Sequence, residues 1–266
     1  MRVETLHRYP VKSMLGESLE SMVVDERGAE GDRWLALVDA VTGRVATAKH
    51  PRLWRALLRF AASGDPGRVR IELPDGGSVA ADDQGVDELL SGLLGRLVRL
   101  VSERARGAEV ERPAPEDVLD RGVEAEVDYA TLEIGQATPG SSFHDYGPLH
   151  LITAATLERI GVEKERYRPN LVVSTPPGYP AYAENEWVGR ELSVGGVRLG
   201  GLIPTPRCAV PTLEHGPLPL APHAVRTPMA ENRVEAPGFG VQPCAGLYLE
   251  VLAEGTIRTG DPVTLH

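Results

Sequence analysis

Short stretches in which hydrophobic and polar residues alternate run along most of the chain, and glycine or proline separates many of them. Alternation of this kind, bounded by turn-forming residues, predicts β-strands. In the first part of the chain it predicts strands at residues 2–10, 19–25, 33–39, 68–74 and 96–102. Later it predicts a buried strand at 168–175, a hairpin around Gly195 and Gly196, and a second hairpin within 245–266.

Two segments have the apolar spacing of helices. Residues 82–95 begin with acidic residues and then place apolar residues on one helical face. The residues on that face are Val86, Leu89, Leu90, Leu93 and Leu94. Within 148–161, a strand or extended entry leads into a short helix that Thr153 can cap and Gly161 ends.

Residues 103–122 break the pattern with charges and prolines, which is typical of a linker or a long exposed loop. The 29 glycines, the 22 prolines and an aromatic share of only 5% favour short strands joined by turns. We therefore expect a mainly β protein with a few helices, built as two β-barrel-like domains of residues 1–105 and 106–266.

The formal net charge of −10 argues against broad binding of nucleic acids or anionic membranes, because both require a basic face. No apolar run reaches the roughly 20 residues of a membrane span, and the first residues lack a hydrophobic signal region. We expect a cytoplasmic protein without nucleic-acid or membrane partners. In that compartment Cys208 and Cys244 are reduced thiols.

Cys208 lies in the segment PTPRCAVPT, where Pro206 and Pro211 stiffen the loop and Arg207 favours a thiolate. A thiolate is a nucleophile and a soft metal ligand, whereas the alternative is a buried, inert cysteine. Zinc ligation by Cys208, His215, His223 and Cys244 does not match a compact Cys/His spacing. A Cys-His hydrolase needs a base, and the sequence does not select among His50, His144, His150 and His215.

Lys12, Arg33 and Arg168 stand at turn edges of an acidic chain and can converge on a phosphate, with Ser13 and backbone NH groups completing the site. Solvated surface is the alternative for each cation. Thr153 and Thr156 are predicted to cap the helix of residues 148–161, and an anion can bind at the same helix start. Asp145 is predicted to form a turn, and Tyr248 to pack among strands.

Several of these motifs together resemble the MOSC superfamily, named from the C-terminal domain of molybdenum cofactor sulfurases. The segments YPVKSMLGESL, GAEGDRWLALVD and ATAKHPRLW resemble its N-terminal β-barrel domain. The segments YRPNLVVS, EWVGRELSVGG, PTPRCAVPT and GTIRTGDPV resemble the MOSC domain itself. By layout the chain is similar to the mitochondrial amidoxime reducing component and its bacterial counterparts, which bind the molybdopterin-type molybdenum cofactor.

The resemblance implies a cofactor cleft between the two domains and a molybdenum ion that is ligated by Cys208, the expected catalytic residue. It implies that the pterin and its phosphate are held by Lys12, Ser13, Arg33, Thr153, Thr156, Arg168 and Asn170, with Arg207 and Tyr248 as further contacts. Ala154 stands where relatives commonly carry an acidic residue, so the substrate pocket is expected to differ in shape.

The activity implied is reduction of small N-oxygenated substrates such as hydroxylamines, amidoximes or N-oxides. No cysteine cluster for an iron–sulfur centre is present, so electrons are expected from a separate ferredoxin or flavoprotein reductase. One alternative is a sulfur carrier, in which Cys208 bears a persulfide that Arg207 stabilises; another is a carrier or storage protein for the cofactor. Because no desulfurase domain is fused to the chain, pyridoxal phosphate is not expected.

Overall fold

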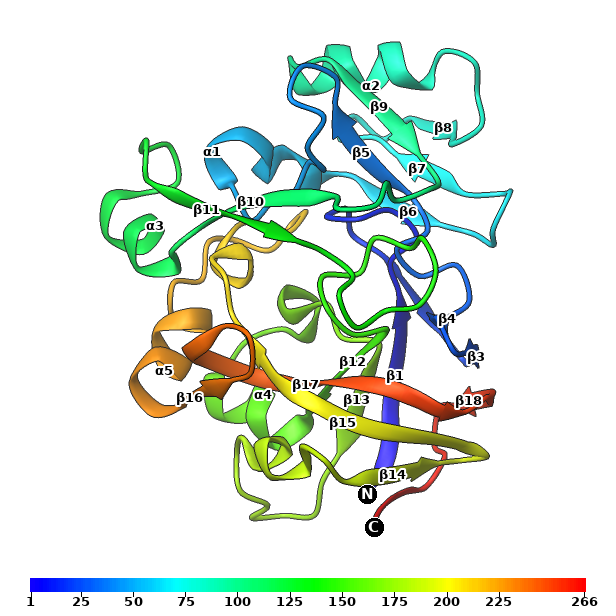
Figure 1. The fold of residues 1–266 in the computed structure, drawn as a ribbon, viewed down its shortest axis with the longest axis vertical. Helices are drawn as coiled ribbons and strands as arrows, with labels where there is room; N and C mark the ends of the chain where they lie inside the picture. Colours follow the sequence, from blue (N-terminus) through cyan, green and yellow to red (C-terminus); the bar gives the residue numbers. More distant parts are fainter.

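A computed structural model describes residues 1–266, and its largest element is a nine-stranded sheet. The strand order is β19-β14-β15-β17-β12-β13-β1-β2, with β16 paired to β17 (Figure 1). Its strands are β1 (Arg2–Arg8), β2 (Glu17–Leu19), β12 (Leu149–Thr153), β13 (Leu171–Ser174), β14 (Glu191–Val194), β15 (Val197–Pro206), β16 (Arg233–Ala236), β17 (Gly240–Ala253) and β19 (Val263–Leu265). A cluster of 18 buried apolar residues packs against this sheet.

The chain is mainly β with few helices, as predicted, but the sheets remain open. The main sheet ends at β19 on one edge and at β2 on the other, and the remaining strands form separate sheets of two or three. None of these strand orders closes on itself, so the sheets do not form a closed barrel. None of the helices is both long and apolar enough to cross a membrane.

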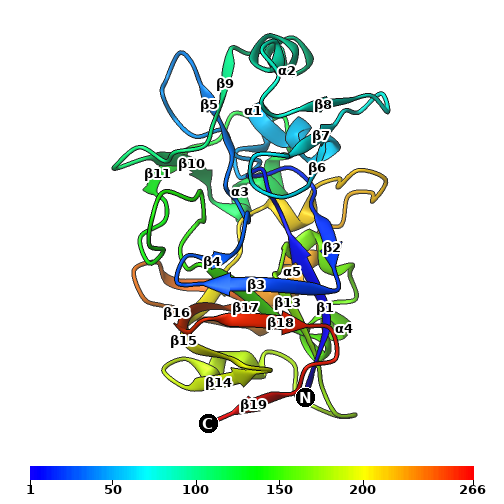
Figure 2. The same ribbon diagram turned by 90° about the vertical axis from the view of Figure 1, so that its right-hand side faces the viewer.

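The first strands of the chain pair with strands from its second half. β1 lies antiparallel to β13, and β3 (Ser21–Asp25) lies antiparallel to β18 (Gly255–Arg258), as Figure 2 shows. The hairpin predicted within residues 245–266 is therefore wrong, because β18 pairs with β3 and not with β17. The division into residues 1–105 and 106–266 stays a prediction, with strand pairing running across it.

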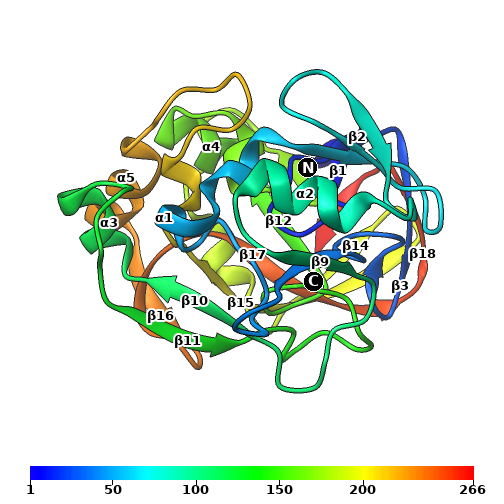
Figure 3. The same cartoon turned by 90° about the horizontal axis from the view of Figure 1, so that it is seen from above.

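A second core of 14 buried apolar residues lies in the part of the chain between β1 and β10. Its elements are β5 (Ala36–Asp39), α1 (Pro51–Trp54), η1 (Arg55–Arg59), β6 (Ala61–Ser63), β7 (Arg70–Glu72), β8 (Ser78–Ala80), α2 (Val86–Leu94) and β9 (Val98–Val101). Figure 3, in which the molecule is seen from above, shows α2 next to β9. The predicted helix is confirmed, but Leu89 and Leu93 face solvent and only part of the apolar stripe packs inward.

The segment predicted as a linker, residues 103–122, is instead an ordered part of the fold. It contains β10 (Glu109–Pro113), which pairs with β11 (Tyr129–Glu133), and α3 (Pro115–Arg121). Val110 and Val118 are buried, so each element has an apolar anchor that the charged composition concealed. β10 and β11 also contribute residues to the cavity described below.

Most of the remaining helical segments pack against β12, β13, β15 and β17, which are inner strands of the main sheet. They are α4 (Ala154–Ile160), η2 (Lys164–Tyr167), η3 (Ala183–Trp187), η4 (Val210–Thr212) and α5 (His223–Glu231). As predicted, the Thr153 side chain caps α4 by accepting from the Thr156 NH group at 3.2 Å, and Gly161 ends the helix with a positive φ of 75°.

Candidate functional site

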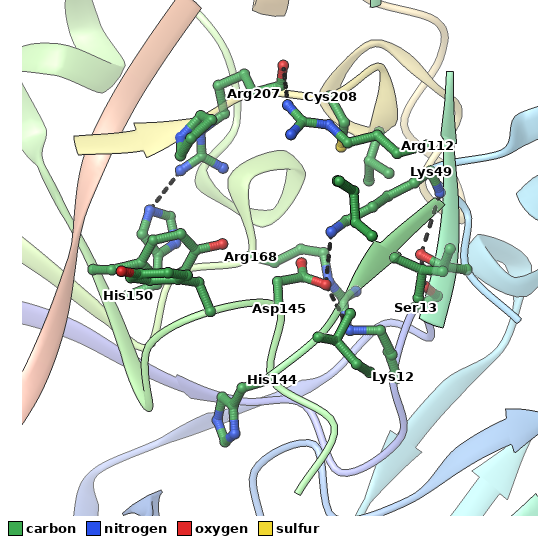
Figure 4. A pocket seen from close by; sticks show the side chains of 18 of the residues that line it. Lys12, Ser13, Lys49, Arg112, His144, Asp145, His150, Arg168, Arg207 and Cys208 are labelled. Atoms are coloured by element: carbon green, nitrogen blue, oxygen red, sulfur yellow. Dashed lines mark hydrogen bonds and ion pairs between the residues drawn. The ribbon is translucent and has the colours of Figure 1, made fainter. Parts of the chain in front are cut away.

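One large cavity is lined by side chains from both halves of the chain, including the β10–β11 pair. It is lined by most of the residues singled out in the sequence, although they come from segments far apart in the chain. The predicted site residues that it brings together are Lys12, Ser13, Arg33, Arg168, Asn170, Arg207, Cys208 and Tyr248. Figure 4 shows how several of these side chains surround a common space.

The cavity is basic although the chain is acidic. Seven Lys and Arg side chains line it against two carboxylates, whereas the whole chain carries a formal charge of −10. The basic residues are Lys12, Arg33, Lys49, Arg112, Arg166, Arg168 and Arg207, and the acidic ones are Glu133 and Asp145. A local excess of cations of this kind attracts anions despite the overall charge.

Lys12 and Ser13 lie in the turn that follows β1. Ser13 has a φ of 66°, and its hydroxyl accepts a hydrogen bond from the Ala48 NH group at 3.1 Å, which fixes the turn. The buried Lys12 Nζ donates to the Phe143 carbonyl and to Asp145 Oδ1, both at 2.7 Å. Burial lowers the pKa of Lys12 to about 8, although Asp145 opposes that change.

Arg33 and Arg168 lie against the same buried ring, that of Tyr9. Their guanidinium carbons are 4.9 and 4.4 Å from the ring centroid. Both residues have positive φ angles, of 48° and 54°, which turn the side chains into the cavity lining. Burial, together with the charge of Arg33, lowers the pKa of Arg168 to about 10. Arg168 Nη2 is buried without a hydrogen-bond partner, so this donor is available to a ligand.

Asp32 is the carboxylate that binds several residues of this cluster. Its carboxylate is buried and accepts from the Tyr9 NH group at 2.7 Å, from Asn170 Nδ2 at 3.0 Å and from His144 Nε2 at 3.1 Å. It also forms an ion pair with Arg33. Burial alone would raise the pKa of Asp32, but Arg33 and the donors hold it far below its ordinary value. Asn170, which itself lines the cavity, helps to hold Asp32 in place.

Cys208 follows the end of β15, is half-buried, and lines the cavity. The guanidinium of Arg207 does not turn toward this thiol. It donates instead to the Ala245 carbonyl and, at 2.6 Å, to His150 Nε2. Arg112 is the cation beside Cys208 in Figure 4, and its Nη2 lies 3.4 Å from the Arg207 carbonyl. Arg207 therefore makes no hydrogen bond to Cys208, and its expected support of a thiolate through charge stays a prediction.

His150 forms an uncharged part of the wall. Burial and the neighbouring Arg207 hold its pKa well below the ordinary value, so its Nε2 keeps a lone pair for the Arg207 donor. Gly246 makes room for this ring: its φ is 84°, and a Cβ there would overlap His150 Nε2 and lie 2.6 Å from the Leu151 carbonyl. This is a close approach that only glycine allows.

Thr153 and Thr156 do not line the cavity. Their hydroxyls donate to Glu184 Oε2 at 3.0 and 2.9 Å, and Glu184 Oε1 accepts from the Gly246 NH group at 3.2 Å. The helix start that was expected to receive an anion is therefore occupied by a carboxylate of the chain itself. Burial raises the pKa of Glu184, while these hydrogen bonds oppose the shift.

The structure brings together neither the zinc ligands nor the Cys-His pair that the sequence analysis considered. No group of three or more His, Cys, Asp or Glu residues could hold a metal ion, so the zinc combination does not form. Among the histidines, His50 bonds to Glu111 at 2.7 Å, and none hydrogen-bonds Cys208. Sequence reasoning missed Asp32, Lys49 and Arg112 as site residues. Asp32 and Lys49 lie inside segments already quoted for the family resemblance, which was the available signal.

Comparison with known proteins agrees with the layout. The family model of the MOSC N-terminal beta barrel domain matches residues 1–91, and that of the MOSC domain matches residues 142–264. The mitochondrial amidoxime reducing component 2 of Rattus norvegicus is 30% identical over 132 residues, and component 1 of Mus musculus is 29% identical over 138. These alignments cover 46% and 47% of this chain but only 38% of each relative.

Two solved structures are also similar. The YuaD protein from Bacillus subtilis aligns over 100% of this chain and 94% of its own, at 12% identity and a TM-score of 0.40. YiiM from Geobacillus stearothermophilus aligns over 45% of this chain and 54% of its own, at 19% identity and a TM-score of 0.32. With its two matched domains in order, the chain belongs to the MOSC superfamily and combines the MOSC N-terminal domain with the MOSC domain.

Proposed function

We propose that this protein binds a molybdopterin-type molybdenum cofactor in the basic cavity and reduces small N-oxygenated compounds such as hydroxylamines, amidoximes or N-oxides. The observation that carries the proposal is a half-buried thiol, Cys208, on the wall of a cavity lined by seven cations. A soft thiolate suits molybdenum, and a cluster of cations suits a phosphate tail.

The residues present fit such a cofactor. Arg168 Nη2 is a buried donor without a partner, and a phosphate oxygen would satisfy it. Arg33 and Arg168 also carry like charges against one ring, which an anion would balance. Cys244 does not compete for the metal, because it is fully buried, lies outside the cavity lining, and has its pKa raised by burial to about 11.

In this scheme Cys208 would ligate the metal, and Lys12, Ser13, Arg33 and Arg168 would hold the phosphate. Asn170 lines the cavity and also binds Asp32, whereas Thr153 and Thr156 act only through Glu184 and the Gly246 backbone. When bound, the cofactor would supply two-electron chemistry that removes oxygen from nitrogen.

The wall near His150 suits an uncharged substrate. Burial keeps His150 neutral and raises the pKa of Tyr248, so that both rings remain uncharged near pH 7. Their ring centroids lie 5.8 Å apart, and Tyr146 lies 5.8 Å from Tyr248 on the same lining. These rings can exclude water from one side of a bound molecule and orient it.

The names of the relatives support this chemistry, since they are amidoxime reducing components, although the match covers 38% of their length. We propose a separate electron-donor protein, because the chain has only two cysteines and no iron–sulfur cluster motif. Both thiols are unpaired, which is compatible with the cytoplasmic location expected from the sequence.

Metal and pterin analysis tests the proposal. The protein is purified from a host that makes the cofactor, together with Cys208→Ala and, as a matched control, Cys244→Ala. We expect molybdenum and pterin in the wild type and the control, and loss of molybdenum in Cys208→Ala. The wild type should also oxidise a reduced dye when an amidoxime or hydroxylamine is added. Absence of molybdenum together with an added sulfur atom on Cys208 would instead support the sulfur carrier.

A further inference from the structure

Asp145 stands between two lysines that line the basic cavity. Its Oδ1 atom lies 2.7 Å from Lys12 Nζ and 2.7 Å from Lys49 Nζ, as the dashed lines in Figure 4 show. Lys12 follows β1, Lys49 precedes α1, and Asp145 precedes β12, so three distant segments meet at one carboxylate oxygen. Sequence reasoning had assigned Asp145 only to a turn.

The surroundings of this carboxylate are strongly cationic. Its side chain is 34% exposed, whereas those of Lys12 and Lys49 are 5% and 14% exposed. Burial would raise the pKa of Asp145, but the two lysines hold it well below its ordinary value, so the group is ionised. Asp145 Oδ2 accepts no hydrogen bond from the protein, so both contacts with the lysines fall on Oδ1 of a partly exposed side chain.

Lys12 and Lys49 also line the cavity in which we propose that an anionic ligand binds. Each ammonium has three donors, and Lys12 spends one on the Phe143 carbonyl and one on Asp145. A phosphate offers more acceptor oxygens and more charge than one carboxylate. Any anion that binds both lysines must therefore compete with Asp145 for the same donors.

We propose that Asp145 is the internal counter-ion of the cavity: it holds Lys12 and Lys49 together without ligand, and a phosphate group displaces it from both. The inference rests on the proposed function only in taking phosphate as the anion. Asp145 thereby acts as a specificity-determining residue, because an anion with a single charge and few acceptors does not outcompete it. Its negative charge weakens phosphate binding and stabilises the ligand-free protein.

Titration calorimetry of the full-length, cofactor-free protein with inorganic phosphate at low ionic strength tests this. Asp145→Asn keeps the size of the side chain and removes the charge, so we expect phosphate to bind about tenfold more tightly. The matched control Asp82→Asn, at an exposed aspartate without a hydrogen bond, should leave the affinity unchanged. Unchanged or weaker binding by Asp145→Asn overturns the proposal.

A second measurement does not depend on the folding of a variant. A crystal structure of the wild-type protein soaked in phosphate should show both ammonium groups on the phosphate and Asp145 released from them. A phosphate bound while Asp145 still bridges the lysines overturns the proposal. Both readouts use protein without molybdenum, so their failure is distinguishable from failure of the reductase function, which depends on metal content and Cys208.

Discussion

Arg33 Nη2 donates a hydrogen bond to the main-chain carbonyl of Arg168 at 3.0 Å, which brings together two cations that are 135 residues apart in the chain. Arg33 is neutralised by Asp32, but Arg168 has only the Met14 carbonyl, at 2.5 Å, and the Tyr9 ring. The pair therefore carries unbalanced positive charge and one unused donor. The affinity for anions and the free energy of unfolding both depend on this arrangement.

Replacing Arg168 by glutamine should weaken anion binding. The variant loses a charged donor that has no partner in the protein, and charge-assisted hydrogen bonds contribute about 1.5–3 kcal/mol, so phosphate affinity should fall about tenfold or more. The thermal stabilisation by phosphate should shrink in parallel. The exposed Arg226→Gln is the control, and a phosphate response equal to that of the wild type in Arg168→Gln would contradict the assignment.

Asp32→Asn should be among the most destabilising single changes. The substitution leaves the largely buried Arg33 without its ion-pair partner, and breaking a buried pair in this way costs about 3–5 kcal/mol. Urea denaturation monitored by tryptophan fluorescence measures the loss. Asp128→Asn, at an exposed position, should change the free energy of unfolding by less than about 0.5 kcal/mol. Equal midpoints for the two variants would show that Asp32 does not anchor the cluster.

Gly246→Ala should disturb the site as well as the fold. The new Cβ would overlap His150, and the positive φ adds backbone strain, so the loss should reach about 3 kcal/mol. Gly161→Ala is the matched control: its φ is 75°, but no atom lies within 4 Å of a Cβ, and its cost should be about 1 kcal/mol. Similar costs for the two variants would mean that the contact with His150 is easily relaxed.

Acid should destabilise the protein before its carboxylates titrate. Burial lowers the pKa of His7 and of His215 to about 4, whereas a histidine in the unfolded chain titrates near 6.5. Between those values the unfolded state binds more protons, so stability decreases as the pH falls through this window. The expected loss at pH 5 relative to pH 8 is about 2 kcal/mol for each of the two histidines.

Urea midpoints at pH 8 and pH 5 test that sign. His150 and His144 are shifted in the same direction and add to the effect. Asp32 and Asp145 keep their stabilising charge throughout this range, because their pKa values lie below the ordinary carboxyl value. His7→Gln should reduce the difference between the two midpoints. A midpoint that does not change with pH would argue that these histidines are protonated in the folded protein.

Local pattern predicted many of the elements in this fold. The strand at β13, the hairpin of β14 and β15, helix α2 and the cap at Thr153 all depend on neighbouring residues, so they could be predicted without knowledge of the rest of the chain. The failures have tertiary causes. β18 pairs with β3 across more than two hundred residues, and the charged segment 103–122 folds because Val110 and Val118 find distant partners.

For the site, the sequence by itself identified Cys208, the turn residues Lys12 and Arg33, and the family to which these motifs belong. It could not show that Arg207 turns away from the thiol or that Glu184 takes the helix start offered by Thr153 and Thr156. Nor could it bring Asp145 between Lys12 and Lys49. Side-chain direction and charge pairing depend on which distant segments lie next to each other, and the tertiary structure alone decides that.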